Sequence, residues 1–356
     1  MRKFTRVPLA LMAAGALVLS ACGADDSTPA APAPDAPAPA PAPDAEVKAC
    51  LITDTGGVDD RSFNQTAWEG LLRAQDELGV EAKFLESTSE ADYEPNIQAF
   101  IDEGCDVIVT VGFLLGDVTE QFALANPDQA FGIIDYAYDV EYENLLAMVY
   151  ATDQAGFLAG YLAAGMTETG TVGTWGGLNI PPVSIFMDGY LAGVNHYNAV
   201  KDASVEVLGW DGTDGVFTGD FDAQDLGNSA TADMLQNGAD IIMPVAGPAG
   251  LGTATAIQDF GSGKMIWVDT DGFFSTTFGS IILTSVEKKM DNSTFDLVRS
   301  VVDGSFNGGL YLGTLDNEGV GISPFHDFDG DVPAELKAEL EQLRAEIIAG
   351  NLQTTP

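Results

Sequence analysis

The sequence predicts an α/β protein with two lobes of like architecture, each built around a parallel sheet. Short β-branched runs alternate with helical stretches from residue 47 onward, which is typical of parallel sheets covered by helices on both faces. The pattern starts again near residue 154, with no detectable sequence repeat. Hydrophobic residues make up 46% of the 356 residues, enough to bury a large core. Two such units in succession suggest two lobes that face a cleft.

The first unit begins with a strand and a strongly patterned helix. Trp68, Leu71 and Leu78 share one face of this helix, while Asp60 is placed to cap it and Gly79 to end it. The predicted strands of the unit are residues 47–53, 82–85, 107–111 and 131–134, and its predicted helices are 61–78, 93–103 and 117–125.

The second unit repeats the alternation. Its predicted strands are residues 171–174, 205–208, 241–245 and 265–268, and its predicted helices are 154–164, 184–200, 225–236 and 253–260. Trp175 follows the first of these strands, so we expect it in a loop, either at the rim of a pocket or packed in the core.

The N-terminus predicts export. Residues 1–6 carry three basic side chains, residues 7–19 are apolar, and the run is too short to be a permanent membrane span. The sequence Leu19-Ser20-Ala21-Cys22 resembles a bacterial lipobox, which makes residues 1–21 a signal peptide and Cys22 the site of a lipid. An ordinary secretory signal with a chance cysteine is the alternative. With the lipid, the protein is extracytoplasmic and anchored to the bacterial cell membrane.

Residues 22–46 form the predicted linker between lipid and folded body. Seven prolines lie between Pro29 and Pro43, mostly alternating with alanine. Such a chain favours extended polyproline II and acts as a semi-rigid spacer of about 3 Å per residue.

The charge balance excludes one class of partner. The chain has 54 acidic and 14 basic side chains, for a net charge of -40. Removal of the signal takes away three cations and no anions, which leaves 11 minus 54, or -43. Because binding to nucleic acid depends on Lys and Arg neutralising phosphates, we expect no nucleic-acid partner.

Two cysteines remain in the body, Cys50 and Cys105, each at the start of a predicted strand. Export permits a disulfide, and the two sulfurs meet if the strands are sheet neighbours. Two buried free thiols are the alternative.

In open parallel sheets, ligands bind beyond the carboxyl ends of the strands. The first strand ends in TDTGGVDDRSFNQTAWEGL, and this string closely resembles the first signature of the basic membrane protein (PnrA-like) lipoproteins, which are nucleoside-binding components of ABC importers. Shorter matches follow in order around Asp135, Asp153, Phe221, Gly247 and Asp269, and the last is Leu283-Thr-Ser-Val-Glu-Lys288. The resemblance covers residues 47 to about 350.

The resemblance implies the type I periplasmic binding protein fold, with two Rossmann-like lobes joined by three hinge crossovers. These crossovers should fall near Thr152, Ser285 and Gly313. The first lobe would then contain residues 47–151 and 286–312, and the second lobe residues 152–285 and 313–356. A helix at about 335–348 would join the second lobe.

The resemblance also implies a nucleoside site. Phe63 and Phe221 match the stacking positions, Asp54 and Asp135 the base-side carboxylates, and Asp269 the ribose-side carboxylate. The site also includes Asn64, Gly247, where the backbone can approach the sugar, and Lys288, a donor to ribose hydroxyls. Lys289 competes with Lys288 for that place, since a shift of one residue exchanges them.

The predicted function is a lipoprotein that binds a nucleoside, of purine type, and delivers it to an ABC permease and its ATPase. We expect a monomer with no cofactor, no metal and no catalytic residues. One alternative is a sugar or furanose-type binding protein of the same fold; another is a sensor that never meets a permease. A more distant alternative is a nucleoside hydrolase, but Ile52 stands where its calcium motif needs an aspartate.

Overall fold

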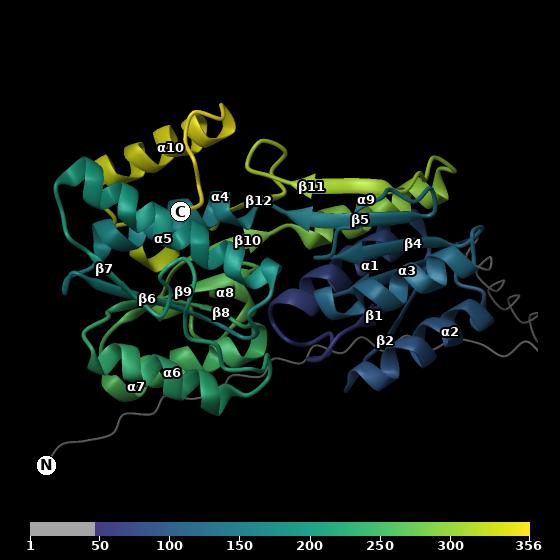
Figure 1. Cartoon of the computed structure of the whole chain (residues 1–356), viewed down its shortest axis with the longest axis horizontal. Helices are drawn as coiled ribbons and strands as arrows, with labels where there is room; N and C mark the ends of the chain where they lie inside the picture. Colours follow the sequence, from purple (N-terminus) through teal and green to yellow (C-terminus); the bar gives the residue numbers. More distant parts are fainter. Residues whose placement is uncertain (1–46) are drawn as a thin grey trace, which may run out of the picture. The chain divides into compact units, whose positions relative to one another are not determined.

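A computed structural model describes residues 47–356 of the chain (Figure 1). The predicted signal peptide, Cys22 and the linker up to residue 46 lie outside the described residues. The described chain forms two six-stranded sheets with helices around them, which confirms the predicted α/β class.

All strands of the first sheet are parallel, in the order β11-β5-β4-β3-β1-β2. Its strands are β1 (Lys48–Thr53), β2 (Glu81–Leu85), β3 (Val107–Val111), β4 (Ala130–Ile134), β5 (Leu145–Tyr150) and β11 (Gly309–Gly313). The helices packed on it are α1 (Phe63–Leu78), α2 (Tyr93–Glu103), α3 (Gly116–Ala125) and α9 (Met290–Val302). Alternate residues of β1 belong to different hydrophobic clusters, so both faces of this sheet are covered.

The second sheet has the order β12-β10-β9-β8-β6-β7, and only β12 runs antiparallel to its neighbour. Its strands are β6 (Thr171–Gly176), β7 (Glu206–Leu208), β8 (Ile241–Val245), β9 (Lys264–Asp269), β10 (Ile282–Lys288) and β12 (Val320–Ile322). The main helices of this part are α4 (Thr152–Met166), α5 (Pro181–Lys201), α6 (Gln224–Gln236), α7 (Leu251–Phe260) and α10 (Ala334–Ile348). Short helical turns are η1 (Glu90–Asp92), η2 (Phe113–Leu115), η3 (Gly247–Gly250), α8 (Gly272–Ser275), η4 (Gly279–Ile281) and η5 (His326–Phe328).

Four strands were not predicted from the sequence: β5, β10, β11 and β12. Of these, β11 and β12 lie at sheet edges, and Gly309, Gly313 and Gly321 occur within them, so their sequence pattern resembles that of a loop. The predicted lobe boundaries stay predictions. In the structure, β10 belongs to the second sheet up to Lys288, and α9 packs beside α1.

Trp175 lies in β6 rather than in a loop, because the strand continues to Gly176. Its side chain is fully buried, and its indole Nε1 donates to Thr231 Oγ1 at 3.0 Å. Trp175 is therefore a core residue and does not rim the pocket.

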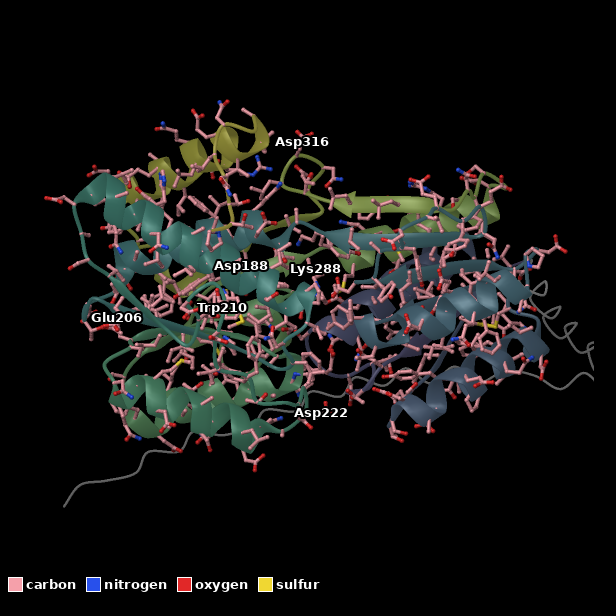
Figure 2. The ribbon with its side chains drawn as sticks, in the orientation of Figure 1. Asp188, Glu206, Trp210, Asp222, Lys288 and Asp316 are labelled. Atoms are coloured by element: carbon pink, nitrogen blue, oxygen red, sulfur yellow. A yellow bond between two sulfur atoms is a disulfide. The ribbon has the colours of Figure 1, made fainter. Side chains whose placement is uncertain are left out.

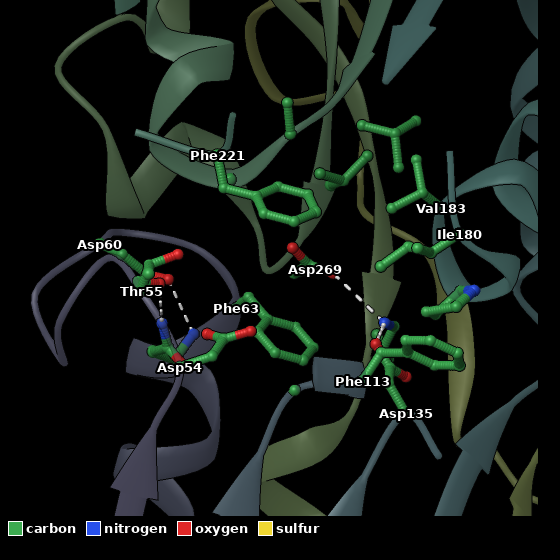
Figure 3. Close-up of a pocket in the computed structure, with 18 of the residues that line it drawn as sticks. Asp54, Thr55, Asp60, Phe63, Phe113, Asp135, Ile180, Val183, Phe221 and Asp269 are labelled. Carbon is green, nitrogen blue, oxygen red and sulfur yellow. Dashed lines mark hydrogen bonds and ion pairs between the residues drawn. The ribbon is translucent and has the colours of Figure 1, made fainter. Parts of the chain in front are cut away.

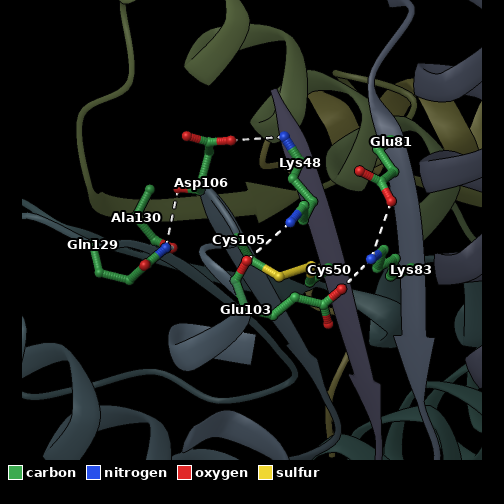
Figure 4. The surroundings of a disulfide bond; sticks show 9 residues. All are labelled: Lys48, Cys50, Glu81, Lys83, Glu103, Cys105, Asp106, Gln129 and Ala130. Carbon is green, nitrogen blue, oxygen red and sulfur yellow. Dashed lines mark hydrogen bonds and ion pairs between the residues drawn. A yellow bond between two sulfur atoms is a disulfide. The ribbon is translucent and has the colours of Figure 1, made fainter. Parts of the chain in front are cut away.

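A disulfide joins Cys50 on β1 to Cys105, which precedes the neighbouring strand β3 (Figure 4). The pairing of β1 with β3 brings the two Cα atoms to 6.1 Å, and both residues are buried. The bond spans 55 residues, a loop for which chain entropy predicts a stabilisation of about 4 kcal/mol.

Among residues 47–356, no helix combines the length and the apolar character that crossing a membrane requires.

Candidate ligand-binding site

The register of the sheets gathers the strand ends at one pocket. Thr53, Val111 and Ile134 share one row of the first sheet, so the residues that follow them, Asp54, Gly112 and Asp135, are neighbours. In the second sheet, Asp269 ends β9 and Lys288 ends the adjacent β10. The pocket lies where these ends meet, and its empty space is about 600 Å³ including the open mouth (Figure 3).

The eight residues predicted to bind the ligand all line this pocket: Asp54, Phe63, Asn64, Asp135, Phe221, Gly247, Asp269 and Lys288. Lys289 does not line it, because its ammonium instead pairs with Glu287 at 2.6 Å. In the structure Lys288 lines the pocket and Lys289 does not, while the binding roles of the eight residues stay predictions.

One end of the pocket is built around Lys288, and we call Lys288, Asp135 and Asp269 the Lys288 end. The Lys288 Nζ lies 2.7 Å from Asp135 Oδ2 and 3.8 Å from Asp269 Oδ1. Figure 2 shows Lys288 inside the body, whereas the exposed acidic residues Asp316 and Glu206 lie at its periphery. The protein thus places one scarce cation between two buried carboxylates, and Asp135 is grouped with Asp269 rather than with Asp54.

Three aromatic rings surround the same ammonium. The distances from Lys288 Nζ to the ring centroids are 4.9 Å for Phe63, 5.2 Å for Phe186 and 5.5 Å for Tyr150. Aromatic faces stabilise a cation where water is excluded, so they offset part of the cost of burying Lys288.

Both carboxylates of the Lys288 end have unusual backbones. Asp135 has φ 70° and Asp269 has φ 72°, in the left-handed region that residues other than glycine rarely adopt. Burial raises the pKa of each carboxyl, and the nearby Lys288 opposes that rise. Strained backbones that persist next to buried charges are typical of functional sites.

The opposite end of the pocket, the Asp54 end, consists of Asp54, Asn64 and Gly112. Asp54 is 7% exposed, and in the described part of the chain no Lys or Arg forms an ion pair with it. Burial raises its pKa well above the ordinary value; neighbouring carboxylates add to this rise, and the Asn64 side chain opposes it. The Asn64 amide donates to the Thr55 carbonyl at 3.2 Å, but its buried Oδ1 has no partner within residues 47–356.

Gly112 makes room for the Asp54 carboxylate. A Cβ added at Gly112 would lie 2.1 Å from Asp54 Oδ2, and the φ of Gly112 is +122°. Only glycine meets both conditions, so the side chain of Asp54 depends on this residue for its place.

Asp60 organises the turn between Asp54 and α1. Its carboxylate accepts hydrogen bonds from the backbone N–H groups of Ser62, Asn64 and Gln65, at 2.8 to 3.0 Å. Burial raises the pKa of Asp60 to about 7. The predicted cap is therefore present, although the helix begins at Phe63 rather than at residue 61.

Two phenyl rings lie on different sides of the pocket. Phe63 opens α1, and Phe221 comes from the loop before α6, where its carbonyl accepts from the Ala249 N–H at 2.8 Å. In Figure 3 the rings of Phe63 and Phe221 project into the space between them from opposite sides. A flat ligand between them would contact an aromatic face on each side.

Further lining residues were not predicted from the sequence: Phe113, Leu114, Ile180, Pro182, Val183 and Phe186. Phe113 and Leu114 directly follow β3, so a search of every strand end would have included them. Residues 180–186 belong to the start of α5, where an apolar side chain facing a pocket has the same sequence pattern as one facing the core. Within the described residues, no group of His, Cys, Asp or Glu side chains is arranged to hold a metal ion.

Two sheets whose strand ends meet at one pocket are the arrangement of periplasmic substrate-binding proteins. A solved ABC transporter solute-binding protein from Aeropyrum pernix is similar in fold, with a TM-score of 0.80 and 27% sequence identity. The match covers 87% of this chain and 94% of that one. The chain thus has the fold of ABC transporter solute-binding proteins, which confirms the predicted periplasmic binding protein fold.

Sequence comparisons identify the family. The family model described as "ABC transporter substrate-binding protein PnrA-like" matches residues 47–353, so the chain belongs to this family. An uncharacterized lipoprotein of Pyrococcus abyssi is 32% identical, over 80% of this chain and 70% of the relative. The ABC transporter nucleoside-binding protein BmpA of Lactococcus lactis is 28% identical, over 86% of this chain and 88% of the relative. The protein is therefore an ABC transporter substrate-binding protein, from a family that binds substrates and is not catalytic.

Proposed function

We propose that this protein is a lipid-anchored receptor that binds purine nucleosides and delivers them to an ABC permease, without catalysing a reaction. The observation that carries the proposal is the pocket itself, with two opposed phenyl rings and a different set of polar groups at each end. The name of the Lactococcus lactis relative supports the ligand class.

The rings suit a flat base. Stacking on an aromatic side chain contributes about 1–3 kcal/mol per base, and Phe63 and Phe221 offer two faces. At the Asp54 end, the Asp54 carboxyl and the free Oδ1 of Asn64 are acceptors for the N–H groups of a base edge. A saturated sugar ring packs its C–H groups on an aromatic ring, but it has no planar π-face for both rings and no N–H edge.

The Lys288 end suits the sugar hydroxyls. The carboxylate of Asp269 accepts from hydroxyl groups, and the ammonium of Lys288 donates to them, so each is a charge-assisted partner. We assign Asp135 mainly to holding Lys288, because it makes the closer contact with the ammonium.

The charges of the pocket favour an unphosphorylated ligand. Four carboxylates line it, from Asp54, Asp60, Asp135 and Asp269, and Lys288 is the one cation among the lining residues. Because a phosphate would meet this negative field, we expect nucleotides to bind far more weakly than nucleosides.

Membrane attachment and transport complete the proposal. The lipobox-like residues before Cys22 and the lipoprotein name of the Pyrococcus relative support a lipid anchor. Ligand contacts from both sheets would stabilise a closed state, because a ligand shifts a conformational equilibrium only by its different affinity for the two states.

Calorimetry on ligand-stripped protein tests the ligand class. We expect heat of binding with adenosine, guanosine or inosine, weaker binding with uridine, and none with ribose, glucose or adenosine monophosphate at the same concentrations. Heat with a sugar and none with any nucleoside would refute the proposal.

Two phenylalanine variants test the pocket. Phe63→Ala and Phe221→Ala should each weaken nucleoside binding at least tenfold, because each removes one stacking face. Phe274→Ala is the matched control, since Phe274 is 76% exposed and lies outside the pocket lining. Unchanged affinity in both pocket variants would show that the ligand binds elsewhere.

A further inference from the structure

The hydroxyl of Ser62 reaches from one sheet to the other. Ser62 lies in the turn that follows β1 of the first sheet, directly before α1, and it is fully buried. Its Oγ is 2.7 Å from Asp269 Oδ2 and 3.2 Å from the Val268 carbonyl oxygen, at the end of β9 in the second sheet. The ligand-binding residues predicted above do not include Ser62.

The local structure frees this hydroxyl from its usual task. A serine directly before a helix normally accepts a hydrogen bond from a backbone N–H of the first turn. Here the Asp60 carboxylate accepts from the N–H groups of Asn64 and Gln65, and Ser62 makes no capping bond of its own. The Ser62 hydroxyl is consequently available as a donor to Asp269.

The Asp269 side chain is held at both oxygens. Ser62 donates to Oδ2, while Lys288 Nζ lies 3.8 Å from Oδ1. The backbone of Asp269 is in the left-handed region, so its position needs support from the surrounding structure. A hydrogen bond to a buried carboxylate is among the stronger ones that a hydroxyl forms, and it leaves few orientations open to the acceptor.

We propose that Ser62 is a positioning residue for sugar recognition: it orients the Asp269 carboxylate so that the pocket distinguishes nucleosides that carry 2′- and 3′-hydroxyls from those that lack them. This inference rests on the proposed function. Phe63 is the next residue in the chain, so one turn both presents a stacking ring and fixes the carboxylate that reads the sugar. Recognition of the base and of the sugar is thereby coupled through Ser62 and Phe63.

The test compares two ligands in each variant. Adenosine, guanosine and inosine are titrated into the full chain beside their 2′,3′-dideoxy analogues, for the unaltered protein and for Ser62→Ala. We expect Ser62→Ala to lose at least tenfold in affinity for the ribonucleosides and less than twofold for the dideoxy analogues. The ratio of the two affinities comes from one preparation, so it does not depend on the fraction of protein that is folded.

Two further variants separate positioning from a general structural role. In an Asp269→Ala background, Ser62→Ala should change the ratio no further, because the acceptor that Ser62 orients is gone. Ser323→Ala is the matched control, since Ser323 is also buried and its Oγ accepts from the Ser285 N–H at 2.8 Å outside the pocket lining. This control should leave the ratio unchanged.

Three outcomes would overturn the proposal. Equal losses for both ligand types in Ser62→Ala would show a general structural role, and the proposed function would stand. Equal affinity of the unaltered protein for ribonucleosides and dideoxy analogues would show that the hydroxyls are not read. Failure of the unaltered protein to bind any of the six ligands would refute the proposed function and this inference with it.

Discussion

The two ends of the pocket differ in how their buried carboxylates are satisfied. At the Lys288 end, the protein supplies the cation itself and pairs it with Asp135 and Asp269. At the Asp54 end, Asp54 has no ion-pair partner within residues 47–356, and the nearby Oδ1 of Asn64 is without a donor. Buried polar groups are normally satisfied. The Lys288 end is thus assembled before the ligand arrives, whereas the Asp54 end leaves bonds for a ligand to complete.

The largest effect should come from removing the cation of the assembled end. Lys288→Met leaves two buried carboxylates uncompensated, so the free energy of unfolding at pH 7 should fall by about 3–5 kcal/mol. Urea unfolding measures it, and the deficit should shrink in acid as the carboxyls become protonated. Lys289→Met is the matched control, since Lys289 pairs with Glu287 and stays outside the pocket; it should cost less than about 1 kcal/mol. Equal losses would mean that the Lys288 end is not specially dependent on its cation.

A smaller effect should follow from filling the space beside Asp54. Gly112→Ala adds a Cβ 2.1 Å from Asp54 Oδ2 at a φ of +122°, and the clash and the backbone strain together should cost about 3 kcal/mol. In an Asp54→Ala background the carboxylate atoms are gone and only the Cβ of residue 54 stays close, at 3.1 Å, so the cost should fall to about 1–2 kcal/mol, mostly from backbone strain. Urea unfolding of the four proteins gives both values. The same cost in both backgrounds would show that the Asp54 side chain does not depend on a glycine at position 112.

Asp54→Asn, unlike the two variants above, should make the protein more stable. The folded-state pKa of Asp54 is raised above the ordinary value of 3.8, so between these two values the folded protein holds a proton that the unfolded chain has lost. Stability therefore falls as the pH rises through this window. Asparagine does not titrate, and the variant should be more stable by about 1 kcal/mol or more at pH 8, with no advantage near pH 3.5.

Nucleoside affinity should fall in the same Asp54→Asn variant, because the N–H donors of a bound base favour the ionised form of Asp54, and a carboxylate is a stronger acceptor than an amide. Thermal melting at several pH values and calorimetry at pH 7 measure the two effects. A variant that is less stable than the unaltered protein at pH 8 would contradict the idea that the Asp54 end is left unsatisfied.

The strand-end rule and the family motif together predicted the polar residues of both ends. Asp54 and Asp135 each follow a predicted strand of the first sheet and Asp269 one of the second, so the parallel order places each at the carboxyl edge of its own sheet. The strand order did not predict which of these carboxylates is paired with a cation. Whether a carboxylate has a cation partner depends on contacts between residues as distant as Asp135 and Lys288, and no local pattern reports such a contact.

The apolar part of the site was predicted least well. Phe186 and Tyr150 lie against Lys288, but each is a buried aromatic in an element whose pattern indicates only packing. The turn at Ser62 shows the same limit. The sequence predicted that Asp60 caps α1, but only the structure shows that the Ser62 hydroxyl, thus free of capping, donates to Asp269.

The smallest effect on stability should come from Gly247, where the backbone borders the pocket. Gly247 has φ +50°, and an added Cβ would meet no atom closer than the Phe221 carbonyl oxygen at 4.0 Å. Gly247→Ala should therefore cost only the strain of the left-handed conformation, about 1 kcal/mol. Because the new methyl group occupies the space that a sugar would approach, affinity should fall about tenfold.

Gly261→Ala is the matched control, since Gly261 ends α7 with φ +85° and has free space around its Cβ. A similar loss of stability in both variants, with a loss of affinity only at Gly247, would show that the ligand approaches this backbone closely; equal affinities would place the ligand nearer to the first sheet.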